Sequence, residues 1–240
     1  GYNVVSSILR GIGDSKRPMY FIAISCCVNI LGDLLLVGGF RLGAAGAAAA
    51  TVAAQAISFL CSLIALKKSG LPFPVIVRPE RGKLVKVLQL GVPVALQDVL
   101  TTLSFIIITV VVNLIGLDQS AAVGVVERII GFSMVIPVAF MSSLAVFAAQ
   151  NIGARQPERA KRGIWIAMGV SLGLTAILFA AMQLIPGALM GIFTTDAKVV
   201  YHGVLYLRTY SIDALMVCFV FCLNGFFSGC GHTGFTMFNC

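Results

Sequence analysis

Six long apolar runs divide this sequence, and they restrict its fold more than any other feature. Each run holds at least 21 residues, and about 20 apolar residues in a helix are enough to cross a bilayer. A backbone surrounded by lipid must satisfy its own hydrogen bonds, so the runs predict helices. Hydrophobic residues make up 59% of the chain and charged residues 11%, against about 25% charged in soluble domains. The sequence therefore predicts an all-α, polytopic membrane protein with spans at roughly 18–38, 44–66, 89–113, 120–148, 164–185 and 200–227.

The basic residues of the loops alternate between the two sides of these spans. Thirteen Lys and Arg residues fall in the first, third and fifth loops, whereas the other loops hold only Arg41 and Lys198. The positive-inside rule places the basic loops in the cytoplasm and predicts a multi-pass protein of the inner (plasma) membrane. Membrane lipid is the expected partner for these loops, because their charge faces anionic headgroups. The net charge of +8 therefore predicts no nucleic-acid partner.

A glycine-containing string near the start of the chain returns near its end. "SILRGIGDSKRPM" at 7–19 matches "GFFSGCGHTGFTMFN" at 225–239 with an offset of 218, which pairs Gly11 with Gly229 and Gly13 with Gly231. A phosphate-binding loop would follow a strand, whereas these glycines follow membrane helices. We interpret both strings as tight helix–loop–helix turns, and the offset as a repeat of six helices with the same orientation in the membrane.

The motifs around these turns resemble one transporter family. "ILRGIGDSKRPM", "NILGD" at 29–33 and "LGAAGAAAATVAAQ" at 42–55 are similar to the first half of multidrug and toxic compound extrusion (MATE) transporters. "LGVPVALQ" at 90–97, "AQNIGARQPERAKRG" at 149–163 and "LNGFFSGCGHTGFTM" are similar to the second half. The resemblance covers essentially the whole chain.

The resemblance implies two pseudo-symmetric six-helix lobes, both incomplete here. On that pattern the chain runs from the end of family helix 4 to just past helix 10, and the missing helices of the same parent chain are expected partners. Residues 1–66 would belong to the first lobe, 67–88 would form a cytoplasmic linker, and 89–240 would belong to the second lobe. Within the linker region, "KLVKVLQL" predicts a short basic amphipathic helix on the inner leaflet.

Carboxylates inside spans are the candidate functional residues, because an intramembrane charge is costly. Asp33 lies one helical turn from Asn29, so the pair could bind a proton or Na⁺, or the amide could simply satisfy the acid. Glu127, Asp98 and Asp213 are the other intramembrane acids. Structural polar contacts between helices are the alternative for each of them. In the resembled family, coupling involves acids on helices 1, 7 and 10. On this pattern helix 1 is absent from the chain, Asp98 lies on helix 7 and Asp213 on helix 10 without matching a family motif, and Glu127 on helix 8 falls outside the pattern.

These features predict secondary active efflux of a small, amphipathic and often cationic substrate in exchange for H⁺ or Na⁺ by alternating access. A lipid-linked oligosaccharide flippase is the alternative within transport, although only Arg128 and Arg208 are available inside spans to hold a pyrophosphate. A receptor or membrane enzyme is the alternative of another class. We expect no enzyme activity, catalytic residue, metal site or cofactor beyond the coupling ion, because the two histidines and seven cysteines form no recognisable constellation.

Overall fold

The computed structural model describes residues 2–68 and 81–238, and within those ranges the regular structure is entirely helical. The chain divides into two compact units, Gly1–Arg78 and Pro79–Cys240. Six described helices are long and apolar enough to cross a membrane. They coincide with the six predicted runs, so the prediction of an all-helical membrane chain is confirmed: Lys16–Gly39, Gly43–Lys67, Arg81–Ile115, Leu117–Gly153, Pro157–Leu184 and Ala197–Gly229.

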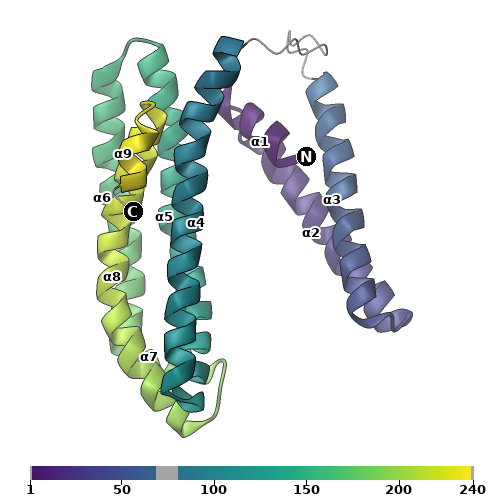
Figure 1. Ribbon diagram of the computed structural model, residues 1–240, viewed down its shortest axis with the longest axis vertical. Helices are drawn as coiled ribbons and strands as arrows, with labels where there is room; N and C mark the ends of the chain where they lie inside the picture. Colours follow the sequence, from purple (N-terminus) through teal and green to yellow (C-terminus); the bar gives the residue numbers. More distant parts are fainter. Residues whose placement is uncertain (1, 69–80, 239–240) are drawn as a thin grey trace. The chain divides into compact units, whose positions relative to one another are not determined.

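The first unit is a pair of long helices with a shorter helix packed against both. Helices α2 (Lys16–Asp33) and α3 (Gly43–Lys68) run side by side (Figure 1), and α1 (Tyr2–Gly11) contacts each of them. The expected single helix over 18–38 is interrupted, because η1 (Leu34–Gly39) is a π-helical segment that directly follows Asp33. Val5, Leu9 and Phe21 form the buried core of this unit.

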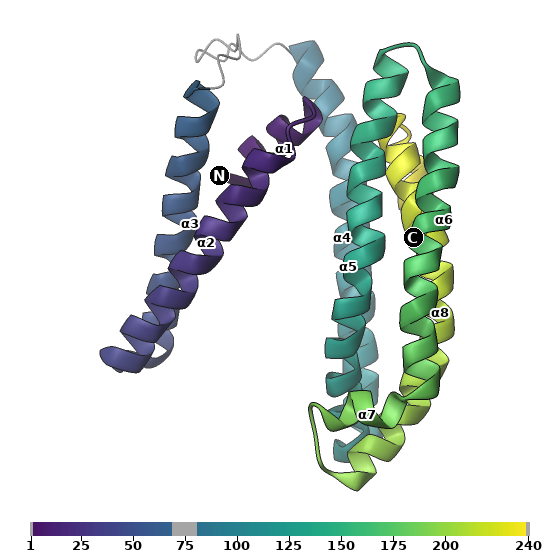
Figure 2. The same ribbon diagram turned by 180° about the vertical axis from the view of Figure 1, so that it is seen from behind.

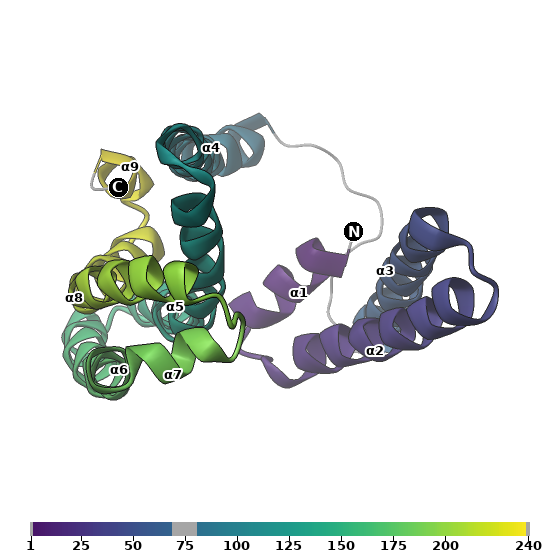
Figure 3. The same ribbon diagram turned by 90° about the horizontal axis from the view of Figure 1, so that it is seen from below.

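The second unit is built around the contact between two long helices. Figures 2 and 3 show α5 and α8 together with α6, and α6 packs against both of them. Helix α4 packs against α5 and the short α9, and the short α7, which the sequence did not predict, packs mainly on α8. The bounds are Arg81–Ile115 for α4, Leu117–Gly153 for α5, Pro157–Leu184 for α6, Pro186–Gly191 for α7, Ala197–Gly229 for α8 and Thr233–Phe238 for α9.

The expected linker over 67–88 differs from the described structure at both of its ends. Residues 67–68 complete α3, and residues 81–88 are the first turns of α4. "KLVKVLQL" is therefore continuous with the following span rather than a separate amphipathic helix, because α4 runs without a break through Gly91 and Pro93. Residues 69–80 lie outside the described residues, so the division into lobes and linker stays a prediction.

The two glycine turns have the same backbone hydrogen bonds. After α1, the amide of Gly13 donates to the carbonyl of Arg10 at 2.9 Å, and the amide of Asp14 donates to that of Leu9 at 2.9 Å. After α8, the residues 218 positions later form the same two bonds at 3.0 and 2.9 Å. Gly13 has φ +93° and Gly231 has φ +85°, a conformation that side chains with a Cβ disfavour. Both strings thus end a helix with a left-handed glycine, as helix C-termini commonly do.

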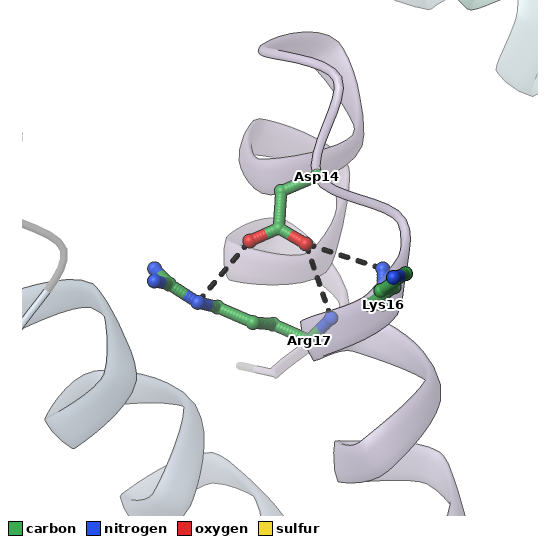
Figure 4. A network of polar contacts seen from close by, with 3 residues as sticks. All are labelled: Asp14, Lys16 and Arg17. Atoms are coloured by element: carbon green, nitrogen blue, oxygen red, sulfur yellow. Dashed lines mark hydrogen bonds and ion pairs between the residues drawn. The ribbon is translucent and has the colours of Figure 1, made fainter.

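The side chains of the two turns differ although their backbones agree. Asp14 Oδ1 accepts hydrogen bonds from the amides of Lys16 and Arg17 at 3.2 Å each, and its Oδ2 lies 3.2 Å from Nε of Arg17 (Figure 4). The carboxylate therefore stabilises the exposed N-terminus of α2. The matching position in the second turn is His232. Helix α9 begins at Thr233, the residue directly after His232, and it has no acidic cap at the His232 position.

Candidate functional site

A polar cluster in the first unit joins the two predicted residues of α2 to α3. Asn29 and Asp33 lie four residues apart and therefore share one face of α2. Nδ2 of Asn29 donates to the hydroxyl of Thr51 at 3.2 Å, and that hydroxyl donates to the carbonyl of Ala47 at 2.9 Å. The amide is thus engaged with the neighbouring helix rather than with the acid. Thr51 was not a predicted site residue, and only the packing of α3 on α2 identifies it.

One carboxylate oxygen in this cluster is enclosed but has no hydrogen-bond partner. Oδ1 of Asp33 is buried, and within the described parts of the chain no donor reaches it. An ionised oxygen in this condition is costly inside a membrane. A proton or a small hard cation would remove that cost, because carboxylate, amide and hydroxyl oxygens are the ligands such ions take. The enclosed oxygen of Asp33 therefore distinguishes this cluster as a candidate ion site.

Close helix packing encloses this oxygen. A Cβ atom added to Gly32 would lie 2.8 Å from Cβ of Ala50, so the backbones of α2 and α3 approach closely where both residues are small. The π-helical segment η1 begins immediately after Asp33. Such segments are rare and frequently occur at functional sites. The small residues of "GAAGAAAAT" thus have a defined use: they place Thr51 within reach of Asn29.

A second acidic cluster lies in the second unit, on α5 and α8. The charges of Glu127 on α5 and Asp213 on α8 both act on the phenol of Tyr206, and Asp213 also acts on Tyr210. The two tyrosine rings are 6.2 Å apart at 54°. Sequence analysis missed both tyrosines, although spacings of four and three residues place Tyr206, Tyr210 and Asp213 on one helix face.

The carboxylates of this second cluster are exposed, unlike Asp33. Both Glu127 and Asp213 are open at the surface of the unit. Arg128 is adjacent to Glu127, but the described ion pairs do not include a bond between them. The nearby backbone of α8 is held from α6, because Nε2 of Gln183 donates to the carbonyl of Arg208 at 3.0 Å and to the hydroxyl of Ser211 at 2.8 Å.

Among the described residues, no hydrogen bond or ion pair joins Asp98 to either cluster. Asp98 is exposed on α4, a helix with no buried residue among those described, and its backbone carbonyl accepts from the hydroxyl of Thr102 at 2.8 Å. The next turns of α4 line a small cavity of about 180 Å³, closed on one side by Met237 of α9. Its wall combines Gln97, Thr101 and Ser104 with Phe105 and Ile108, a mainly apolar surface with a few polar groups, as small-molecule pockets have.

Comparison with known proteins places these features in a family. The MatE family model matches residues 93–239. The probable multidrug resistance protein YoeA of Bacillus subtilis (strain 168) is 31% identical over 222 residues, which are 88% of this chain and 48% of that protein. YpnP of the same organism, also described as a probable multidrug resistance protein, is 30% identical over 96% of this chain and 52% of its own length.

Solved structures agree in fold. A MATE crystal structure in the straight conformation matches 99% of this chain and 54% of its own chain with a TM-score of 0.91 at 21% identity. The chain thus spans about half the length of the relatives it matches. The match to the MatE model covers more than half of the chain and agrees with six spanning helices, so this chain belongs to the MatE (MATE) family of membrane transporters.

Proposed function

We propose that the native transporter exports small, amphipathic and often cationic compounds in exchange for H⁺ or Na⁺. The single observation that carries this proposal is the buried, unpartnered Oδ1 of Asp33 beside the Asn29–Thr51 hydrogen bond. Multidrug resistance relatives support the class of substrate. Neither a cofactor nor a catalytic step enters the proposal, and nucleic acid is not a partner.

Asp33 couples the ion gradient to a conformational change. In the ion-free state, the enclosed oxygen destabilises any conformation that keeps it away from water. Binding of a proton or Na⁺ removes this penalty, so the ion favours one conformation over the other by the difference in its affinity for the two. Asn29, held by Thr51, orients its amide oxygen toward the same helix face and helps to position the ion.

In the second unit, Glu127 and Asp213 are the candidate functional residues. Their open carboxylates attract cations, and the tyrosine rings beside them offer the apolar faces on which organic cations bind. They are accordingly candidates for ion coupling or for holding the cationic part of the substrate. The flippase alternative has less support, because Arg128 and Arg208 are the basic residues available inside spans. Asp98 remains a candidate beside the cavity of α4.

The transporter lies in the inner (plasma) membrane with its basic loops in the cytoplasm. Its relatives are about twice as long, and the remaining helices of the same polypeptide would complete both lobes. Several helices of the described chain have wide apolar faces: α4 has no buried residue and α2 has two. Lipid and these remaining helices would cover them.

Everted membrane vesicles containing the native transporter test the proposal, with ethidium as the substrate probe. Vesicles are loaded with Na⁺, with acidic buffer, or with neither, and ethidium uptake is followed by fluorescence. We expect uptake to require one of the two gradients, and Asp33→Asn to abolish it. The matched control is Asp118→Asn, which also removes one carboxylate, at the start of α5. Uptake without any gradient, or unchanged coupling in Asp33→Asn, would contradict the proposal.

A further inference from the structure

The turn between α5 and α6 contains a hollow that none of the features above uses. It measures about 510 Å³ and is lined by Arg155, Gln156, Pro157, Glu158, Arg159 and Arg162. Three guanidinium groups therefore border one hollow on the side of the membrane where the basic loops lie. Arginine is the main basic residue of this loop, whereas lysine predominates in the loop that contains Lys67, Lys68, Lys83 and Lys86.

The three arginines carry uncompensated charge. The described part of the chain records no hydrogen bond or ion pair for the side chains of Arg155, Arg159 or Arg162. Glu158 is the single carboxylate lining the hollow, and its Oε1 is bound by Nζ of Lys161 at 3.0 Å. The first turn of the chain is different, because there Asp14 pairs with Arg17. The hollow thus has a net positive charge with free donors.

The backbone holds Arg155 in a conformation that glycine would adopt more easily. Its φ is +56°, and a non-glycine residue in this region is less stable by about 1–2 kcal/mol. The amide of Arg155 donates to Ile152 at 3.0 Å and that of Gln156 to Asn151 at 2.8 Å. This is the hydrogen-bond pattern of the two glycine turns, where Gly13 and Gly231 occupy the equivalent position. The chain therefore keeps an arginine where the turn itself favours glycine.

The chemistry of the hollow suits a phosphate group. Guanidinium groups bind phosphate oxygens through two parallel hydrogen bonds, and three of them can neutralise a phosphodiester with charge to spare. Trp165 is exposed on α6, eight residues after Pro157 and therefore about 12 Å along the helix. Exposed tryptophans mark the membrane interface. The hollow therefore lies on the cytoplasmic side of this interface.

We propose that this hollow binds the phosphate headgroup of an anionic phospholipid in the cytoplasmic leaflet. The lipid neutralises the three guanidinium groups and joins the turn to the membrane surface. The proposal is independent of the transported substrate and of the coupling ion, so it stands or falls separately from the proposed function.

Lipid retention tests the proposal without any transport measurement. The native transporter is purified in detergent with phosphatidylglycerol or phosphatidylcholine, and bound lipid is counted by native mass spectrometry. We expect the wild type to retain phosphatidylglycerol preferentially, and each Arg→Gln change at 155, 159 or 162 to lower its retention about fivefold. The charge-matched controls replace Lys16, Lys67 or Lys86, which lie in the other basic loops, by Gln one at a time. An equal loss in these controls would show diffuse surface attraction and overturn the proposal.

Two further experiments complete the test. The first distinguishes a lipid headgroup from a soluble phosphate, and the second shows whether a loss of lipid binding reflects a folding defect. Inorganic phosphate is added in place of lipid; if it displaces phosphatidylglycerol at low millimolar concentration, a soluble phosphate is the occupant and the lipid proposal is wrong. Arg155→Gly removes the guanidinium but relieves the positive φ. We expect this variant to have a higher Tm than the wild type in lipid-free detergent and a smaller Tm increase on adding phosphatidylglycerol. An unchanged lipid-dependent increase would also overturn the proposal.

Discussion

The two units carry acidic clusters of opposite character. In the first unit, Asp33 has a buried oxygen that no donor of the described residues reaches, and a hydrogen bond joins Asn29 of α2 to Thr51 of α3. In the second unit, Glu127 and Asp213 are open; the charge of Asp213 acts on Tyr206 and Tyr210, and that of Glu127 acts on Tyr206. The two clusters therefore differ in how far the described helices enclose their carboxylates. Our proposals of ion coupling for the first cluster and of cation attraction for the second rest on this difference.

Replacing one carboxylate in each unit should give the largest difference in export rate between the two units. Asp33→Asn should lower gradient-driven ethidium export about 100-fold, equivalent to about 2.7 kcal/mol, because the amide can neither take up a proton nor balance a cation. Glu127→Gln should lower export less than about tenfold, because an exposed carboxylate gains less from neutralisation. Initial export rates at matched expression measure both. A larger loss in Glu127→Gln would reverse the assignment and make the second unit the coupling unit.

Tightly packed glycines allow a second comparison of the units. Adding a Cβ atom at such a glycine should lower the stability of each unit by a different amount. A Cβ at Gly225 would lie 2.4 Å from the carbonyl oxygen of Met141, whereas at Gly32 it meets a methyl group at 2.8 Å. Backbone cannot yield as a side chain can, so Gly225→Ala should destabilise by about 2–3 kcal/mol and Gly32→Ala by about 1–2 kcal/mol. Thermal unfolding of the purified variants measures the order. Gly38→Ala, at a position with open space, should stay near the wild type.

Loss of the hydrogen bond between Asn29 and Thr51 should impair export less than loss of the Asp33 carboxylate. Thr51→Val keeps the shape of the side chain but removes the acceptor for Asn29, so the ion concentration for half-maximal export should rise about tenfold, within the range for a lost hydrogen bond. Thr51→Ser retains the hydroxyl and should restore the wild-type value. If Val and Ser behaved alike, the bond would have no part in ion binding.

Substitutions in the two glycine turns should give the smallest difference, measured as the change in stability. Asp14→Ala removes the acceptor for the amides of Lys16 and Arg17 and should cost about 1 kcal/mol. His232→Ala, at the equivalent position of the second turn, removes no such cap among the described residues and should change stability by less than about 0.5 kcal/mol. Equal effects in chemical or thermal unfolding would mean that the aspartate cap contributes nothing specific.

The sequence by itself determined the class and the number of spans. Length and polarity decide whether a segment can leave water, and the six runs coincide with the six candidate spans. Local rules also sufficed for the turns, because Gly13 and Gly231 are required by a backbone conformation that depends on neighbouring residues alone. The face shared by Asn29 and Asp33 likewise follows from helical spacing.

The tertiary structure decided what these residues meet. Thr51 is 22 residues from Asn29 along the chain, and Tyr206, on which the charge of Glu127 acts, comes from α8, about 80 residues away. No local pattern states which helix faces pack together, because lipid tails cover an apolar helix face as well as another helix does. The same reason hid the difference between an enclosed Asp33 and an open Glu127. Both are single acids in apolar runs, and only helix packing determines which of them loses its contact with water.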